Sequence, residues 1–356
     1  MSVVIYELLE KFSDLLELRR GTTETRITHL RHPTSSDPGS LIFLADGEHF
    51  EFLSENPPAA AVIPKSLENM VENLPGQFTI LSCRNLRLAM ALIAKAYFPH
   101  PLAKQSYGQV AIHPQSFVDS SAKIGSEVVI GPYAVIGRDV TIGNNVYIGP
   151  NTVIEAGSTI GEGTYLHPQV FVAHDTHIGR FCEILPQSSL GSEGFGYATH
   201  SSGSHERLTH FGRLILEDFV HVGSCVSIDR GTLKDSVIGS GTKIDNFCHL
   251  AHNITVGKNC LITAGFISAG SASLGDNNVM GGRVSVAGHI SVCDNVHAAA
   301  LSAIHNNVKK PGAYGGYPLV ELKQFLKMQA SFAHLPRIRR NLSRVMKKLG
   351  LDDEKS

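Results

Sequence analysis

Fourteen aliphatic residues of this chain stand six positions apart without a single miss, between residues 112 and 190. They are Ile112, Val118, Ile124, Ile130, Ile136, Ile142, Ile148, Ile154, Ile160, Leu166, Val172, Ile178, Ile184 and Leu190. A six-residue period fits neither a 3.6-residue helix nor one long strand. It predicts a solenoid with a triangular coil, in which each side is a short strand and the aliphatic residue points to the axis. Glycine directly follows many of these residues, and we expect it at corners where the backbone turns tightly and coils press together.

The same period resumes further along the chain. Three inward positions start at Leu216, and a short insertion at Asp229–Val237 then shifts the register. Twelve more positions follow, and only Ser268 and Ala298 among them are not large apolar residues. These 29 hexads amount to between nine and ten coils at three hexads per coil. We therefore expect a mainly β protein with a parallel β-helix over residues 109–308.

The first 98 residues lack the hexad and predict a small α/β domain. Apolar residues have helical spacing from Val4 to Leu18 and again from Leu86 to Tyr97. Leu41–Leu44 and Ala59–Ile63 are typical of short strands.

The segments that flank the β-helix are expected to be a linker and a helical extension. Residues 99–108 contain two prolines and predict the linker. Residues 309–356 begin with turns and continue as a helical segment that Pro336 divides in two. Ten Lys or Arg stand against one acid in residues 301–350, so this extension either caps the last coil or caps it and also offers a basic docking surface. The basic positions of interest are Arg337, Arg339, Arg340, Lys347 and Lys348.

Composition limits the classes of function. The formal net charge is −1, so the whole molecule has no general attraction to nucleic acid. Six cysteines occur without C-x-x-C spacing, which argues against a disulfide framework or zinc ribbon and fits a reducing compartment. No stretch has the length of a membrane span, and the N-terminus lacks a signal-peptide core. We therefore expect a cytoplasmic protein.

Residues 191–213 interrupt the hexads with more than twenty residues. A long loop on a rigid scaffold often carries function, although a tolerated insertion is the alternative. Phe195 and Tyr197 would be costly to expose in this glycine-rich segment unless they cover something. We interpret them as candidate substrate-binding residues.

Two histidines stand out by their position on the predicted prism. His252 and His289 follow inward residues that are 36 positions, or two coils, apart on the same face. Gly270 falls one coil from His252, and Asp245 and Asn246 of the preceding hexad can come round the edge. The set combines a general base, an uncrowded backbone N–H and further polar groups, as a bound substrate would require.

A zinc site is the alternative for this face, because other histidines are also present. They are His174, His177, His249 and His305. Zinc requires ligands that converge at about 2 Å from one ion, and His174 and His177 fall on a distant hexad. We therefore expect no metal.

Six stretches carry a resemblance to a known family. They are GSLIFL at 39–44, GFGYA at 194–198, IDRG at 228–231, IDNFCHLAHN at 244–253, AGFISAG at 264–270 and VAGHISV at 286–292. In order and spacing the chain resembles the hexapeptide-repeat acyltransferases, and within these the UDP-3-O-(3-hydroxyacyl)glucosamine N-acyltransferases of lipid A biosynthesis. The resemblance implies a left-handed parallel β-helix, a uridine-binding N-terminal domain, and a homotrimer with active sites between neighbouring subunits. It also implies that acyl carrier protein donates a 3-hydroxyacyl thioester to the 2-amino group of UDP-3-O-acylglucosamine, with no cofactor beyond the carrier's phosphopantetheine.

The resemblance implies roles for individual residues. The histidine of the family's AHN motif is His252, the implied general base. Gly270 would offer its amide to the thioester oxyanion, and His289 would contact the acyl or pantetheine portion. Asp245 and Asn246 match the polar pair near the family's site.

The implied uridine site departs from the family pattern. Phe43 keeps the aromatic residue that is expected to stack on uracil. Asp46 stands where asparagine is usual and His49 where tyrosine is usual, and Phe50 could substitute by a shift of one residue. The small residues of Ala298–Ala303 would admit a long or unusual acyl chain.

Two other functions are compatible with the hexads. A sister enzyme of the same fold could O-acylate a UDP-sugar, but the N-terminal domain and the GFGYA segment argue against it. A non-enzymatic β-helix scaffold is the other, and the polar cluster on one face argues against that.

Overall fold

A computed structural model describes residues 2–74, 77–98, 111–315 and 322–350 of the chain. The chain divides into two compact units, residues 1–105 and 106–356. The division falls within the predicted linker, residues 99–108, which lies outside the described residues. Each unit is described by itself below.

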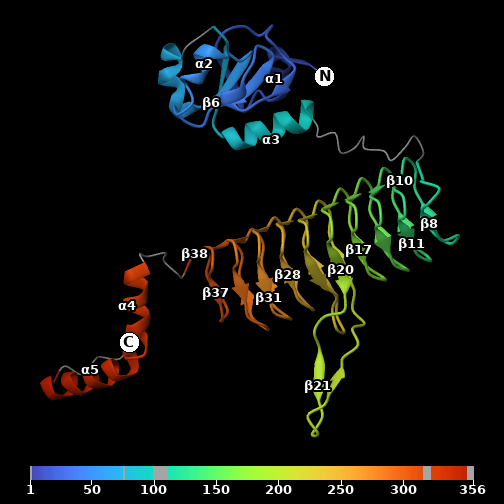
Figure 1. Ribbon diagram of the computed structural model, residues 1–356, viewed down its shortest axis with the longest axis vertical. Coiled ribbons are helices and arrows are strands. Elements are labelled where there is room, and N and C mark those ends of the chain that lie inside the picture. Colours follow the sequence, from blue (N-terminus) through green and yellow to red (C-terminus); the bar gives the residue numbers. More distant parts are fainter. Residues whose placement is uncertain (1, 75–76, 99–110, 316–321, 351–356) are drawn as a thin grey trace. The chain divides into compact units, whose positions relative to one another are not determined.

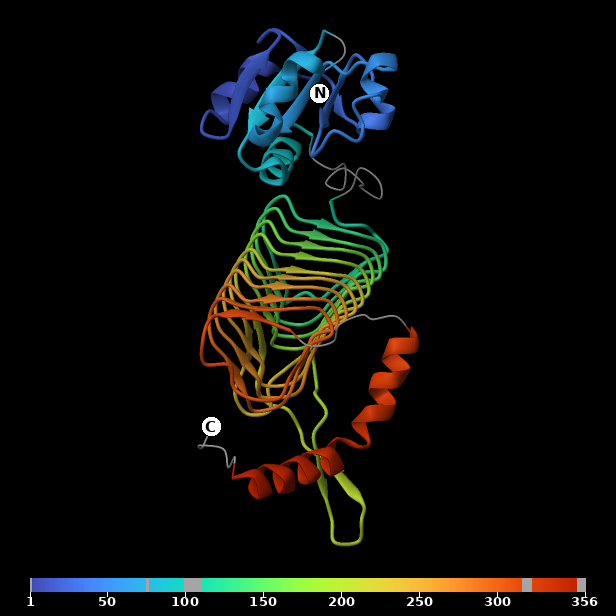
Figure 2. The same cartoon turned by 90° about the vertical axis from the view of Figure 1, so that its left-hand side faces the viewer.

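The second unit is a parallel β-helix built from three sheets, as the hexads predict, and it is left-handed, as the family resemblance implies (Figures 1 and 2). The first sheet has ten strands, β10 (Val129–Ile130), β13 (Tyr147–Ile148), β16 (Tyr165–Leu166), β19 (Glu183–Ile184), β24 (His221–Val222), β27 (Lys243–Ile244), β30 (Leu261–Ile262), β33 (Val279–Met280), β36 (Val296–Ala298) and β38 (Gly312–Tyr314). The second sheet has ten strands, β8 (Phe117–Val118), β11 (Val135–Ile136), β14 (Val153–Ile154), β17 (Phe171–Val172), β20 (Ser189–Ser192), β25 (Ser227–Asp229), β28 (His249–Leu250), β31 (Ile267–Ser268), β34 (Ser285–Val286) and β37 (Ala303–Ile304). The third sheet has nine strands, β9 (Lys123–Ile124), β12 (Thr141–Ile142), β15 (Thr159–Ile160), β18 (His177–Ile178), β23 (Leu214–Leu216), β26 (Ser236–Ile238), β29 (Thr255–Val256), β32 (Ser273–Leu274) and β35 (Ser291–Val292).

The predicted inward residues form the core of this unit. Each pairs with the inward residue one coil on, as Ile130 does with Ile148. Ile148 is completely buried, and the two small inward residues, Ser268 and Ala298, are buried as well. The first coil is less complete, because Ile112 makes only an isolated bridge and is 41% exposed. The hexad prediction of the core is confirmed.

The corners of the coil differ in one respect from the prediction. The residue with left-handed backbone stands three positions after the inward residue, as in Tyr133 (φ 59°) and Asn151 (φ 56°). The glycine directly after the inward residue instead lies against the next coil. A Cβ on Gly149, for example, would be 2.5 Å from the nitrogen of Pro168. The expectation of coils pressing together at these glycines is confirmed, but that of a tight turn there is wrong.

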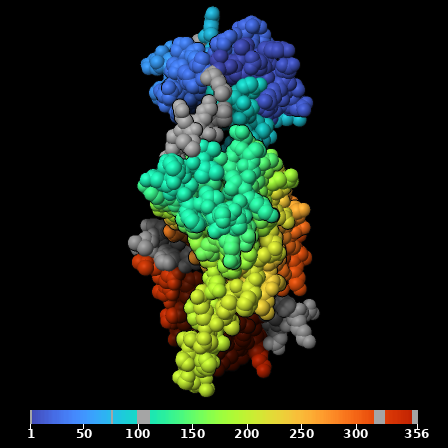
Figure 3. Space-filling model, turned by 90° about the vertical axis from the view of Figure 1, so that its right-hand side faces the viewer, coloured from blue at the N-terminus to red at the C-terminus, as the bar shows by residue number. Residues whose placement is uncertain are grey.

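Two insertions interrupt the coils. Residues 191–213 leave the prism as an antiparallel hairpin of β21 (Tyr197–Thr199) and β22 (His205–Arg207), which stands off its surface (Figures 1 and 3). The second insertion joins β25 to β26 and contains Arg230, which is almost fully buried. Its Nε donates to the carbonyl oxygen of Gly212 at 2.7 Å, so the second insertion is bonded to the end of the first.

The first unit is a small α/β domain with a five-stranded sheet. The sheet order is β2 (Leu16–Arg20), β7 (Thr79–Cys83), β6 (Ala60–Pro64), β5 (Ser40–Phe43) and β4 (His29–Leu30), and only β2 is antiparallel. Beside it lie a β1 (Val3–Val4) and β3 (Arg26–Ile27) pair, the helices α1 (Ile5–Lys11), α2 (Phe52–Glu55) and α3 (Leu86–Tyr97), and 3-10 helices η1 (Pro33–Ser35) and η2 (Lys65–Asn73).

The sequence predictions for this unit hold with one exception. The two predicted strands and the second helix are confirmed as β5, β6 and α3. The helix predicted from Val4 to Leu18 is wrong beyond Lys11, where the chain turns and Leu16 begins a strand. Leu16 and Leu18 alternate with charged residues there, so a period of two wins over the helical spacing.

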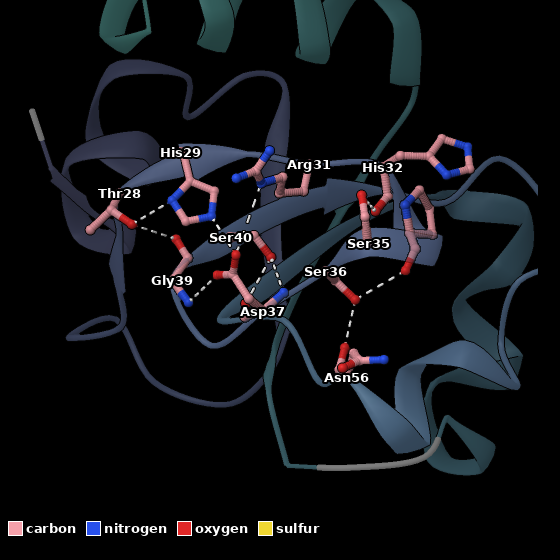
Figure 4. A network of polar contacts seen from close by, with 11 residues as sticks. Thr28, His29, Arg31, His32, Ser35, Ser36, Asp37, Gly39, Ser40 and Asn56 are labelled. Atoms are coloured by element: carbon pink, nitrogen blue, oxygen red, sulfur yellow. Dashed lines mark hydrogen bonds and ion pairs between the residues drawn. The ribbon is translucent and has the colours of Figure 1, made fainter.

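A polar network fixes the turn between β4 and β5 (Figure 4). Asp37 accepts the N–H of Gly39 at 2.9 Å and bonds the Nε2 of His29 at 2.8 Å. The other ring nitrogen of His29 lies 2.8 Å from the hydroxyl of Thr28. The Gly39 N–H, followed by His29, lowers the pKa of the Asp37 carboxyl.

The described part of the C-terminal segment forms two helices, α4 (Leu322–Phe332) and α5 (Leu335–Leu349). Pro336 stands in the first turn of α5, so the predicted division is confirmed.

Strand β38 pairs with β36, so the β-helix extends beyond the expected end at residue 308. Among the described residues, no helix has both the length and the apolar character that crossing a membrane requires.

Candidate active site

His252 lies at the corner between the second and third sheets. Strand β28 ends at inward Leu250, and the chain turns through Asn253, whose φ is 61°. Gly270 occupies the equivalent corner one coil on, directly above the histidine ring. A Cβ on Gly270 would lie 2.5 Å from both the Cε1 and the Nε2 of His252. The main chain of Gly270 therefore packs against the Nε2 side of the imidazole.

The hydrogen bonds of Asn253 determine which nitrogen of His252 carries the proton. The Nδ2 of Asn253 donates to the carbonyl oxygen of Lys234 at 3.3 Å, and its Oδ1 accepts the N–H of Thr232 at 3.2 Å. That same Oδ1 lies 2.9 Å from the Nδ1 of His252. An amide oxygen only accepts, so Nδ1 of His252 is the donor in this contact. In the neutral ring the lone pair is then on Nε2, beside Gly270.

Thr232 connects this corner to both insertions. It stands in the second insertion, and its hydroxyl donates to the Oδ1 of Asn253 at 2.9 Å. Its carbonyl oxygen accepts the N–H groups of Phe211 (2.7 Å) and Gly212 (3.2 Å), where the first insertion returns to the prism. The two breaks in the hexad period thus meet at His252 and hold its partner Asn253 in place.

The backbone of Gly270 offers a hydrogen-bond donor next to the His252 lone pair. Its carbonyl accepts the N–H of His289 at 3.2 Å, but its own N–H has no partner among the described residues. A free N–H and an imidazole lone pair side by side can receive a developing oxyanion and a proton, respectively.

The residues predicted from sequence do not all gather at this corner. His289 stands two coils on, exposed and with a left-handed φ of 60°. Asp245 and Asn246 follow β27 at the corner between the first and second sheets, so β28 separates them from His252. Asn246 Oδ1 accepts a backbone N–H from the preceding coil at 2.7 Å, and Asp245 accepts the N–H of Asn246 at 2.8 Å. Within one chain the structure does not bring this pair to His252.

Two buried groups behind His252 are absent from the sequence prediction. His210, in the returning limb of the first insertion, is 2% exposed, and its ring packs against that of His252 with centroids 5.4 Å apart. Asp229 is 5% exposed, with Oδ2 3.9 Å from the Nε2 of His249. Burial raises the pKa of the Asp229 carboxyl, against the opposing effect of the three histidines. The IDRG motif could have indicated Asp229, whereas no period or motif marks His210.

The described residues around His252 provide neither a cluster of metal ligands nor a reactive thiol. The part of the chain that the structure describes contains no group of three or more His, Cys, Asp or Glu residues placed to hold a metal ion. His174, a candidate for the zinc alternative, instead contacts Arg230 and Asp175. All six cysteines are free, and burial raises the pKa of the Cys182 thiol to about 11. The buried cysteines act as small apolar core residues.

The predicted aromatic residues of the first insertion are strongly exposed. Phe195 is 83% and Tyr197 48% exposed, and their rings lie 5.1 Å apart. Gly194 precedes them and packs against the Cβ of His252, where a side chain would approach to 2.7 Å. The aromatic pair therefore begins next to His252 and faces solvent in the single chain.

The predicted uridine residues lie at the carboxyl edge of the parallel strands in the first unit. Phe43 ends β5 and is half-buried against the domain core. Asp46 is exposed and its Oδ1 accepts the N–H of Glu48 at 3.0 Å. The ring of His49 lies 5.2 Å from that of His32, which follows β4 at the same edge. This edge is where open α/β sheets usually bind ligands.

A different cleft of about 740 Å³ lies at the opposite edge of this sheet. Its lining includes Arg20, Thr22, Pro58 and Phe78. The Arg20 guanidinium donates to the carbonyl of Val71 and lies over the Phe78 ring, so its polar groups serve the fold. The carboxyl edge of the sheet, with Phe43, Asp46 and His49, is therefore the better candidate for a nucleotide site than this cleft.

The predicted basic residues all lie on α5 and are exposed. They are Arg337, Arg339, Arg340, Lys347 and Lys348. Exposed apolar residues, Leu335, Ile338, Leu342, Val345 and Leu349, follow the same helix at alternating spacings of three and four. The helix thus presents an apolar stripe bordered by positive charge.

Comparisons with known proteins match both the repeat and the whole chain. The family model "Bacterial transferase hexapeptide (six repeats)" matches residues 121–156 and 235–265. A UDP-3-O-acylglucosamine N-acyltransferase of Methylococcus capsulatus (strain Bath) is 37% identical over 98% of this chain and 97% of its own. One of Campylobacter lari is 43% identical over 40% of this chain and 44% of its own, less than half of that relative's length. A solved Arabidopsis UDP-N-acetylglucosamine acyltransferase shares the fold, with a TM-score of 0.52 and 22% identity over 58% of this chain and 71% of its own.

Proposed function

Because the chain belongs to the family of UDP-3-O-acylglucosamine N-acyltransferases, we propose that it transfers a 3-hydroxyacyl group from acyl carrier protein to the 2-amino group of UDP-3-O-acylglucosamine, a step of lipid A biosynthesis. The observation that carries this proposal is the contact between the bare Nε2 of His252 and the main chain of Gly270. At this contact, Nε2 of His252 can take a proton while the N–H of Gly270 binds an oxyanion.

The proposed reaction follows from these two groups. The acceptor amine attacks the thioester carbonyl, so a C–N bond forms and the carbonyl electrons move to oxygen, within reach of the Gly270 N–H. His252 Nε2 removes the proton from the attacking nitrogen. The intermediate then collapses with loss of the C–S bond, and the imidazolium returns the proton to the pantetheine sulfur.

We propose that a second copy of the chain completes the site, in a homotrimer. Asp245 and Asn246 stand at a different corner from His252, so they can meet it only across a subunit boundary. The exposed Phe195 and Tyr197 beside His252 would be covered by the same neighbour or by bound substrate. His289, which stands two coils on at the corner position equivalent to that of Asn253, would then contact the acyl or pantetheine portion.

Mixing inactive subunits tests the shared site. His252→Ala and Asn246→Ala trimers should each have low activity, and refolded or co-expressed mixtures should recover part of it, because some sites receive both intact residues. Mixtures of two His252→Ala preparations serve as the control. Mixtures that stay as inactive as their parents would place both residues in one chain's site.

We propose that the uracil ring is held at Phe43, with Asp46 and His49 near its edge. Phe43→Ala should raise the KM for the nucleotide sugar by a factor that corresponds to about 1–2 kcal/mol, in the range of base–aromatic stacking. The KM for the acyl carrier should not change. Phe50→Ala is the matched comparison, and a larger effect there would move the stacking residue to Phe50.

We propose that the basic face of α5 binds the acidic acyl carrier protein. Charge reversal at Arg339 and Arg340 should raise the KM for the carrier, and added salt should do the same in the wild type. Reversal of Arg138, an exposed cation on the β-helix, is the control. A carrier KM that is independent of salt would leave α5 without this role.

An acceptor and donor panel tests the activity as a whole. The protein is assayed with 3-hydroxyacyl carrier thioesters of several lengths against UDP-3-O-acylglucosamine and UDP-N-acetylglucosamine. We expect amide formation on the first acceptor alone. Ester formation on the second would identify the O-acylating sister activity, and no turnover with any pair would favour a scaffold.

A further inference from the structure

A second imidazole, His210, packs against His252 without any assigned role. It comes from the returning limb of the first insertion and is 2% exposed, whereas His252 is only partly buried. The two rings meet at an interplanar angle of 75° with centroids 5.4 Å apart. Burying a histidine side by side with another is costly unless its polar atoms are satisfied.

One nitrogen of His210 is satisfied and the other is not. Nδ1 lies 2.9 Å from the carbonyl oxygen of Leu208. A carbonyl oxygen only accepts, so Nδ1 carries the hydrogen and the Nε2 of the neutral ring has a lone pair. Nε2 is shielded from solvent and has no hydrogen-bond partner among the described residues.

The unpaired nitrogen faces the side of the His252 ring. A Cβ built on Gly194 would lie 3.1 Å from the Nε2 of His210 and 3.0 Å from the Cδ2 of His252, so both atoms border the same small space. A Cβ on Gly196 would lie 3.1 Å from the Cε1 of His210. The two glycines of the GFGYA motif thus make room for His210 beside His252.

We propose that His210 is a positioning residue that stabilises the imidazolium of His252 through its Nε2 lone pair. This rests on the proposed role of His252 as the base. When His252 takes the proton of the amine, its ring becomes a cation, and a neighbouring lone pair lowers the energy of that cation.

Other charged groups at this corner are less suited to the task. Asp229 faces the same histidines from β25, but burial raises the pKa of its carboxyl and weakens it as a counter-charge. His249, on β28, points from the neighbouring strand toward Asp229 at 3.9 Å. Glu193 of the insertion is already paired with Arg207. The lone pair on Nε2 of His210 is therefore the acceptor that remains available to the ring of His252.

A pair of variants of similar size isolates the lone pair. His210→Gln keeps an acceptor oxygen, whereas His210→Leu fills the same space without one. Removing the stabiliser makes His252 harder to protonate, so the acid limb of the kcat/KM profile should move to lower pH in His210→Leu by about half a unit. This is a fraction of the one to three units that a full opposite charge produces at such distances. The plateau kcat should fall by up to about threefold, which is the same half unit expressed as a rate.

His210→Gln should keep the limb near its wild-type position, and His205→Leu, on the hairpin tip, is the control that should change nothing. The His252 ring proton is followed in parallel by NMR titration and identified through its loss in His252→Ala. An equal titration midpoint in the Leu and Gln variants, or a rise in His210→Leu, would overturn the proposal. Should His210→Leu not fold, His210→Phe replaces it.

The NMR midpoint separates this inference from the proposed function. Activity that survives in His252→Ala would refute the base, whatever the His210 variants do. Activity that is lost in His252→Ala, together with an unmoved midpoint in His210→Leu, would refute the role of His210 alone.

Discussion

Gly270→Ala is the most informative single-methyl change that this structure suggests. The new Cβ would lie 2.5 Å from the Cε1 and Nε2 of His252, while ordinary contacts start at 3.4 Å. The imidazole must therefore withdraw by almost 1 Å. The obstacle is the far end of a side chain, so the ring moves and the coil does not, and the free energy of unfolding should change by less than about 1 kcal/mol. A misplacement of this size costs on the order of a hundredfold in rate, so we expect kcat to fall by about that factor.

A matched glycine provides the control for this prediction. Gly282 also stands two residues after an inward residue, but a Cβ there meets its nearest atom at 3.7 Å, so Gly282→Ala should be active. In the double variant with His252→Ala, the second change should cost nothing further, since the methyl group acts through the imidazole. Steady-state kinetics and thermal unfolding measure both effects. Full activity in Gly270→Ala, or additive losses in the double variant, would refute the proposed contact.

Three further outcomes follow from burial and charge. Ile148→Asp places a carboxylate in the completely buried core and should cost several kcal/mol or prevent folding, and an unchanged melting temperature would contradict the inward position. Burial raises the pKa of Asp229 above its unfolded value, so its charged form opposes folding once the pH rises through the folded pKa. Asp229→Asn should then increase the melting temperature at pH 7.5 more than at pH 4, and the reverse order would contradict this sign. A thiol reagent at pH 8 should label exposed Cys225 and spare Cys182, whose pKa is raised to about 11, until the protein is unfolded, as mass spectrometry of the labelled peptides would detect.

The sequence predicts those parts of the molecule in which each residue has the same environment as the one six positions away. Inward residues such as Ile148 and even the atypical Ser268 follow from the period alone, and so does the stacking of Gly270 above His252. Thr232 and His210 could not be predicted, because they lie in the two aperiodic insertions. The place of Thr232 depends on hydrogen bonds with Asn253 and Phe211, which lie in other segments of the chain. The place of His210 depends on the packing of its ring against His252, and no local pattern encodes either relation.

The same reasoning explains the errors in the first unit and at the corners. Leu16 and Leu18 fit both a helical and an alternating pattern, and only pairing with β7 decides for the strand. The glycines after the inward residues suggested tight turns, but the left-handed corner two positions later accepts residues such as Tyr133 and Asn151. Close approach between coils is the reason for those glycines.

The most direct test of the account is the rate of acyl transfer in His252→Ala. With acyl carrier thioester and UDP-3-O-acylglucosamine at saturation, we expect kcat to fall by about 10²–10⁴-fold with modest changes in either KM, and the acid limb of the pH–rate profile to disappear. His289→Ala should lose less, mainly through the KM of the acyl donor. Near-wild-type kcat in His252→Ala, together with an inactive His289→Ala, would contradict the assignment of the base.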